Sequence, residues 1–109
     1  MNTDRSARTA ARERGAPEPE NLQSAAAAGD LARATLLLDR GAAVDARDAL
    51  GRTPLLLAVA QNRLAVVRLL LARGADPNAA DNAGLTPLRQ ANDSDLRDVA
   101  ALLEQAGAR

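Results

Sequence analysis

A nearly identical pentapeptide occurs twice in the chain, as "GRTPL" from Gly51 and as "GLTPL" from Gly84. The two copies start 33 residues apart, and the similarity extends on both sides. "LLLDRGA" from Leu36 is followed at the same interval by "LLLARGA" from Leu69 and "LLEQAGA" from Leu102. Such self-similarity is typical of proteins that stack small units side by side. The three-fold repeat therefore predicts a solenoid, in which each unit buries its apolar face against its neighbours.

Each unit is predicted to form a helix, a sharp turn and a second helix. In the middle unit Thr53 can cap the first helix, about 54–61, and Pro54 suits its first position. Asn62 then tolerates the left-handed backbone of a sharp turn before a second helix at about 64–73. The stretches "AAVDARDALGR" and "ADPNAADNAGL" read as β-turn loops between units. Equivalent positions in the other units hold Thr86, Pro87, Gly29 and Asp95, and Gly41, Gly74 and Gly107 close the second helices.

The pattern D-x-x-G-x-T-P-L, an alanine three residues on, and "VVRLLLARGADPNAAD" resembles the ankyrin repeat, over about residues 21 to 109. This resemblance implies an all-α solenoid of three stacked helix-turn-helix units with β-turn loops, and a non-catalytic module that binds proteins. This chain departs from the family at one position. Leu56 and Arg89 stand where the family usually has histidine, so the hydrogen bond from the histidine to the turn is missing. The middle unit matches best, at Asp48, Gly51, Thr53, Pro54, Leu55, Ala58, Leu64, Val66, Val67, Leu69, Leu70, Gly74, Ala75, Asp76 and Asn78.

The outer units replace apolar residues of the middle unit with polar ones. Leu57 aligns with Ser24 and Gln90, and Leu71 aligns with Glu104. Terminal repeats need a polar outer face to stay in solution, so we expect a complete array with a cap at each end. The predicted domain covers 21–109, with an N-cap repeat at 21–47, an internal repeat at 48–80 and a C-cap repeat at 81–109.

Residues 1–20 differ from the repeats. They carry several arginines and end in "GAPEPE", whose two prolines break any helix and mark a linker. Their only frequent apolar residue is alanine, so a disordered or weakly helical N-terminal tail is predicted. A contact of these arginines with nucleic acid is a weaker alternative, because no aromatic side chain is available for base stacking.

Composition narrows the chemistry further. The chain of 109 residues contains no His and no Cys, and its 14 basic residues are all arginine. The usual general base, the thiol nucleophile and the Schiff-base amine are therefore missing, and so are the preferred ligands of zinc. We predict no enzyme activity, no catalytic residue, no metal site and no cofactor.

Net charge and hydropathy limit the classes of partner and the cellular compartment that we expect. The formal net charge is zero, which favours neither nucleic acid nor an anionic membrane surface as a partner. No apolar run approaches the roughly 20 residues that span a bilayer, and the N-terminus lacks the apolar core of a secretory signal. We expect a cytoplasmic monomer whose partner is another protein.

The resemblance implies binding through a concave face formed by the turn tips and the first helices. Leu50 and Leu85 are the most informative candidates, because exposed apolar side chains beside arginines suit a protein interface. The full set of candidate partner-binding residues is Arg47, Ala49, Leu50, Arg52, Leu56, Gln61, Asn82, Ala83, Leu85, Arg89, Asp93 and Ser94.

Two other functions remain open at this point. The first is a small inhibitor or immunity-type protein that occludes the site of a partner enzyme. The second, which is less favoured, is a metal-assisted hydrolase that uses the clustered acids Asp93, Asp95 and Asp98. This cluster lacks the glycine and the distal glutamate of an EF-hand, and Asp95 is explained by the turn that it occupies.

Overall fold

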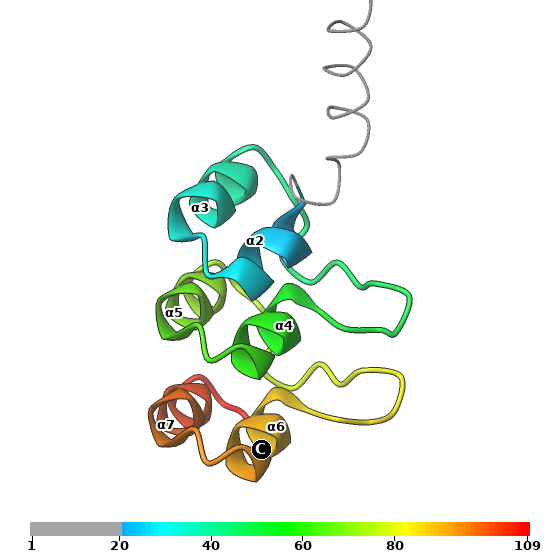
Figure 1. The fold of residues 1–109 in the computed structure, drawn as a ribbon, viewed down its shortest axis with the longest axis vertical. Coiled ribbons are helices and arrows are strands. Elements are labelled where there is room, and N and C mark those ends of the chain that lie inside the picture. The colour runs from blue at the N-terminus through cyan, green and yellow to red at the C-terminus, as the bar shows by residue number, and fades with distance from the viewer. Residues whose placement is uncertain (1–20) are drawn as a thin grey trace, which may run out of the picture.

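The computed structural model describes residues 21–109, which form six helices in three pairs and contain no strand. The pairs stack in chain order, with α2, α4 and α6 in one layer and α3, α5 and α7 in a second (Figure 1). This arrangement confirms the predicted all-α solenoid. The predictions for residues 1–20 lie outside the described residues. The pairs are α2 (Leu22–Ala28) with α3 (Leu31–Asp39), α4 (Pro54–Ala60) with α5 (Leu64–Ala72), and α6 (Pro87–Asp93) with α7 (Arg97–Gln105).

The predicted helix N-caps and left-handed turn residues are found at the predicted positions. The Thr53 hydroxyl accepts a hydrogen bond from the backbone N–H three residues on, at 3.2 Å, and Thr86 does the same at 3.2 Å. Each satisfies an amide that has no partner within its helix. Between the helices of each pair the backbone is left-handed, with φ of 73° at Gly29, 56° at Asn62 and 58° at Asp95.

The core lies between the two helix layers and is built from small and medium aliphatic side chains. Leu55, Val67, Leu70 and Leu103 are fully buried, and alanines such as Ala58 let the short helices approach closely. Burial of one such leucine contributes about 1.5–3 kcal/mol. Among the described residues no buried side-chain nitrogen or oxygen lacks a hydrogen-bond partner.

The two ends of the stack differ in polarity. At the C-terminal end α7 exposes Glu104. At the other end α3 exposes Leu31 and Leu36, each to 43%, although Leu69 and Leu102 at the repeat position of Leu36 pack against the core. No described unit precedes α3, so Leu36 lacks the neighbour that covers its counterparts. Two apolar side chains are therefore exposed at this end of the stack.

Within residues 21–109, no helix combines the length and the apolar character needed to cross a membrane.

Candidate functional site

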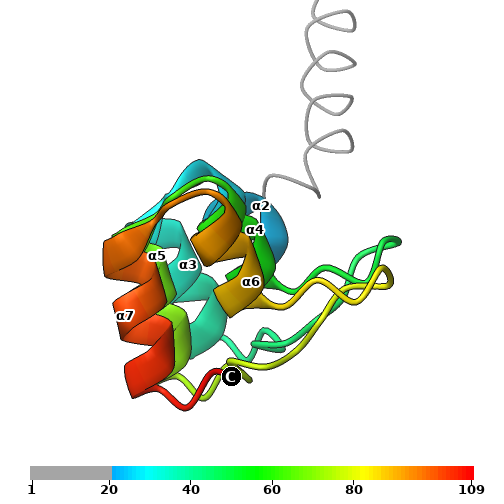
Figure 2. The ribbon, with the colours of Figure 1, turned by 90° about the horizontal axis from the view of Figure 1, so that it is seen from below.

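Two long turns project from the helix stack and lie side by side: the first turn, residues 42–52, and the second turn, residues 75–85 (Figures 1 and 2). Each is closed by an aspartate. Oδ1 of Asp48 accepts hydrogen bonds from the backbone N–H groups of Leu50, at 3.0 Å, and Arg52, at 2.8 Å. Asp81 makes the same two bonds in the second turn, at 2.9 Å each. Both tips therefore have the same backbone support, which is an Asx-type turn.

Asp48 also forms an ion pair, whereas Asp81 forms none within residues 21–109. Oδ2 of Asp48 accepts a hydrogen bond from Nε of Arg52 at 2.8 Å. Burial raises the pKa of the Asp48 carboxyl, but the hydrogen bonds from Arg52 and Leu50 and the Arg52 charge together hold that pKa below its ordinary value. The carboxylate is therefore ionised at neutral pH, and its charge is already matched within the turn.

Hydrogen bonds join the two turns to each other. Nη1 of Arg47 donates to the carbonyl oxygens of Gly51, at 2.8 Å, and Ala80, at 2.6 Å. In the opposite direction, the backbone N–H of Asn82 donates to the Leu50 carbonyl at 3.0 Å. The side-chain amide of Asn82 donates to the Ala49 carbonyl at 3.2 Å. These bonds hold the two tips against one another.

A comparison of two glycines tests this contact. Gly51 and Gly84 occupy the same repeat position and have φ of 79° and 86°. A Cβ at Gly51 would press on the Asn82 side chain and lie 2.9 Å from its backbone nitrogen, whereas a Cβ at Gly84 would meet nothing within 4 Å. We expect Gly84→Ala to lower the free energy of unfolding by about 1 kcal/mol, from backbone strain alone. Gly51→Ala should cost about 3 kcal/mol. Urea unfolding measures both, and equal losses would contradict the contact between the turns.

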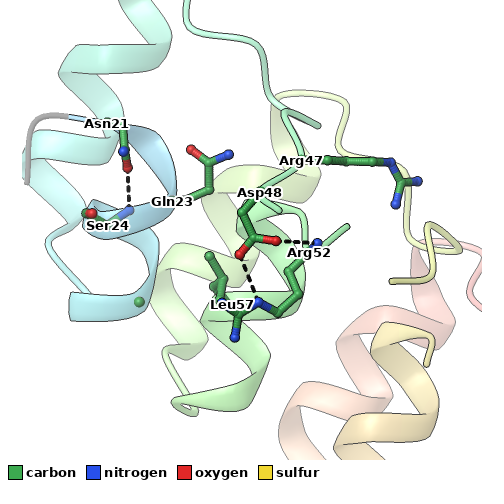
Figure 3. A pocket seen from close by; sticks show the side chains of 8 residues that line it. Asn21, Gln23, Ser24, Arg47, Asp48, Arg52 and Leu57 are labelled. Carbon is green, nitrogen blue, oxygen red and sulfur yellow. Dashed lines mark hydrogen bonds and ion pairs between the residues drawn. The ribbon is translucent and has the colours of Figure 1, made fainter. Parts of the chain in front are cut away.

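A groove of about 470 Å³ lies where α2 and α4 meet the first turn (Figure 3). Four of its residues come from α2 and its N-cap, and these were not among the candidates from the sequence. The sequence held one signal for them: Ser24 and Leu57 occupy the same repeat position, and both line the groove. The lining residues are Asn21, Gln23, Ser24, Ala27, Arg47, Asp48, Arg52 and Leu57.

Most of the candidate residues lie at the surface. Leu50 is 58% exposed at the tip of the first turn, and Leu85 in the second turn is half-buried. Arg52 is partly exposed and paired with Asp48. The remaining exposed candidates are Arg47, Ala49, Asn82 and Ala83 on the turns, and Gln61, Arg89, Asp93 and Ser94 on or just after the inner helices.

Residues 22–109 match the family model for ankyrin repeats, in three copies. The chain belongs to the ankyrin repeat family. Ankyrin repeats are generally protein–protein interaction modules, and the family is typically non-enzymatic. A search of curated proteins finds no match to the chain.

Leu56 requires a correction to the expected surface. It stands where the ankyrin family usually has histidine, and it was expected to contact a partner. In the structure it is only 2% exposed, so it contributes to packing and is left out of the candidate surface. The next residue, Leu57, is the one that reaches the groove. The first turn is closed by Asp48, which accepts hydrogen bonds from the backbone and the side chain of Arg52.

The acids of the ankyrin domain's last unit do not form a metal cluster. Within residues 21–109 no group of three or more His, Cys, Asp or Glu side chains is placed to hold a metal ion. Instead, Oδ2 of Asp93 lies 3.9 Å from Nε of Arg89, and Oδ1 of Asp95 lies 3.2 Å from Nε of Arg97. Asp95 lines a hollow of about 320 Å³, but its side chain is 79% exposed to solvent. A general acid or base with a shifted pKa usually needs a more desolvated setting, so this hollow gives no support to the hydrolase alternative.

Proposed function

We propose that this ankyrin repeat domain binds a partner protein through the concave face between its turn tips and its inner helices. The turns leave the helix stack at an angle, on the side of the layer α2, α4, α6 (Figure 2). The exposed candidate residues lie on these turns and on or just after the inner helices.

The position of Leu50 carries the proposal. Its side chain is 58% exposed, while its carbonyl accepts the hydrogen bond from the Asn82 N–H and its own N–H donates to Asp48. A large apolar side chain is thus presented to solvent on a backbone that is fixed on both sides. Such a preformed surface loses little conformational entropy when a partner binds, which leaves more of the contact energy for affinity.

Leu50→Glu is expected to remove most of the partner binding without unfolding the domain. The substitution replaces an apolar contact with a charge that must be desolvated, and an interface anchor of this kind contributes about 2 kcal/mol or more. Affinity capture from a lysate of the source cells, quantified by mass spectrometry, measures the loss. Circular dichroism of the purified variant shows whether the helices are retained.

Leu36→Glu is the matched control, because Leu36 is also an exposed leucine but lies on the outer helix α3. We expect this variant to capture the same partner as the unmodified chain. If Leu50→Glu retains capture, or if Leu36→Glu loses it equally, the concave face is not the binding surface.

The inhibitor function is a narrower version of the same proposal. It requires that the captured partner is an enzyme and that stoichiometric amounts of this domain reduce its activity. Leu50→Glu should then lose the inhibition in parallel with the binding.

A further inference from the structure

We propose that the groove between α2, α4 and the first turn receives an uncharged apolar side chain of the partner protein, seated against Leu57 and Ala27. The inference rests on the proposed function and specifies the chemistry of the partner. Three properties of the groove carry it: an apolar wall that lies outside the core, polar side chains that the fold itself uses, and charges that cancel.

The apolar wall of the groove is not part of the hydrophobic core. Leu57 is half-buried on α4, and within residues 21–109 it belongs neither to the buried cluster nor to the side chains packed against that cluster. Ser24 occupies the same repeat position on α2 and lines the groove with a much smaller side chain, beside the half-buried Ala27. More of the groove's lining is apolar than polar. A partner that covers this wall removes apolar surface from water, which favours binding.

The polar side chains contributed by α2 and its N-cap mainly serve the fold. The Gln23 amide donates to the Ala46 carbonyl at 3.0 Å and ties α2 to the first turn. The Asn21 side-chain oxygen accepts a hydrogen bond from the Ser24 N–H at 2.8 Å and caps α2. The Ser24 hydroxyl and the Asn21 N–H₂ group have no partner within residues 21–109. These neutral donors suit the backbone carbonyl oxygens of a bound segment, whose side chain then faces the apolar wall.

The charges of the groove cancel. Figure 3 shows the Arg47 guanidinium turned away from the other lining side chains, and its Nη1 donates to the carbonyl oxygens of Gly51 and Ala80. The charged groups that stay in the groove are Asp48 and Arg52, which pair with each other at 2.8 Å. A charged side chain entering the groove would lose hydration without meeting an unpaired opposite charge among these lining residues. The groove therefore selects an uncharged side chain.

The groove is also continuous with the surface around Leu50. The Leu50 N–H donates to Asp48, whose carboxylate lines the groove, so the tip that presents Leu50 begins at the groove's edge. A volume of about 470 Å³ holds a few side chains and no larger element. The best fit is a short partner segment with two apolar residues, of which one enters the groove and the other contacts Leu50.

The sharpest test replaces Leu57 with side chains of similar length that differ in polarity. Leu57→Gln introduces the residue that α6 carries at the same repeat position, Gln90, and Leu57→Met keeps the side chain apolar. Both variants should fold, because Leu57 lies outside the core and both new residues are good helix formers. Urea unfolding followed by circular dichroism checks this. The probe is a random peptide library displayed on phage and selected against the full chain, with Leu50→Glu as a parallel target.

We expect the peptides that require Leu50 to carry a second apolar residue. Their affinity should fall roughly tenfold on Leu57→Gln, because a polar amide then lies against that residue, and stay within about twofold on Leu57→Met. Changing the second apolar residue of a selected peptide to Asp or to Lys should weaken binding to the unmodified chain roughly tenfold or more, for both charges. This last arm decides the question even if Leu57→Gln does not fold.

Each remaining outcome overturns something definite. Leu50-dependent peptides that bind Leu57→Gln as they bind the unmodified chain, or that tolerate Asp or Lys at the second position, overturn the apolar-anchor inference and leave the proposed function standing. Equal losses on Leu57→Gln and Leu57→Met overturn it as well. Free N-acetylleucine amide that competes as well as the peptides would show a small-molecule site instead. If no selected peptide depends on Leu50, the proposed function fails and the inference fails with it.

Discussion

Leu70→Ala is expected to lower the free energy of unfolding by about 3 kcal/mol, which is a large part of the total for a small domain without aromatic residues. Leu70 is fully buried in α5, in the unit that has neighbours on both sides. Its removal would leave a cavity among side chains that are themselves held by flanking units, so the site can collapse only partly. Urea unfolding followed by circular dichroism measures the loss.

Leu36→Ala provides the control, since it makes the same chemical change on a second helix. Leu36 is 43% exposed, so we expect a loss below about 1 kcal/mol. Comparable losses at the two positions would mean that the leucines are equally buried, which would contradict the packing of the stack.

The fold follows from local and periodic features that a single sequence displays. Thr53 caps α4, and Asn62 adopts a left-handed backbone, because these preferences depend on residue type and on immediate neighbours. The interval of 33 residues then sets how many such units there are. The helices consequently end within a residue of their predicted bounds in the middle unit, at Ala60 and Ala72.

The site was harder to predict because it depends on contacts between units. Leu56 and Leu57 are adjacent and chemically identical, yet only Leu57 lines the groove, since the spacing of neighbouring helices decides which side chain is covered. The hydrogen bond from Arg47 to Ala80 and the bond from Asn82 to Leu50 likewise join residues of different units. Repeat spacing shows that the turns are equivalent, but not which side chains cross between them.

Deleting residues 81–109 is expected to abolish cooperative unfolding of the part that remains. Leu56 and Val59 are buried in α4, whereas their counterparts in the last unit, Arg89 and Asn92, are exposed, so the last unit is what covers them. The deletion would expose this apolar face and leave two units, and arrays of this kind need about three for stability. Far-UV circular dichroism during urea unfolding should show a weak helical signal that declines without a sigmoidal transition.

Val99→Asp tests the packing of the last unit in the full-length chain. Val99, in α7, is buried in the core cluster, so an aspartate there forces an unpaired charge into the apolar interior, at an expected cost of about 3 kcal/mol or more. Ala101→Asp, at an exposed position of the same helix, should cost less than about 1 kcal/mol. If the chain ending at Ala80 unfolds at the same urea concentration as the full chain, the units do not support one another. The shared core between them would then contribute nothing measurable to stability.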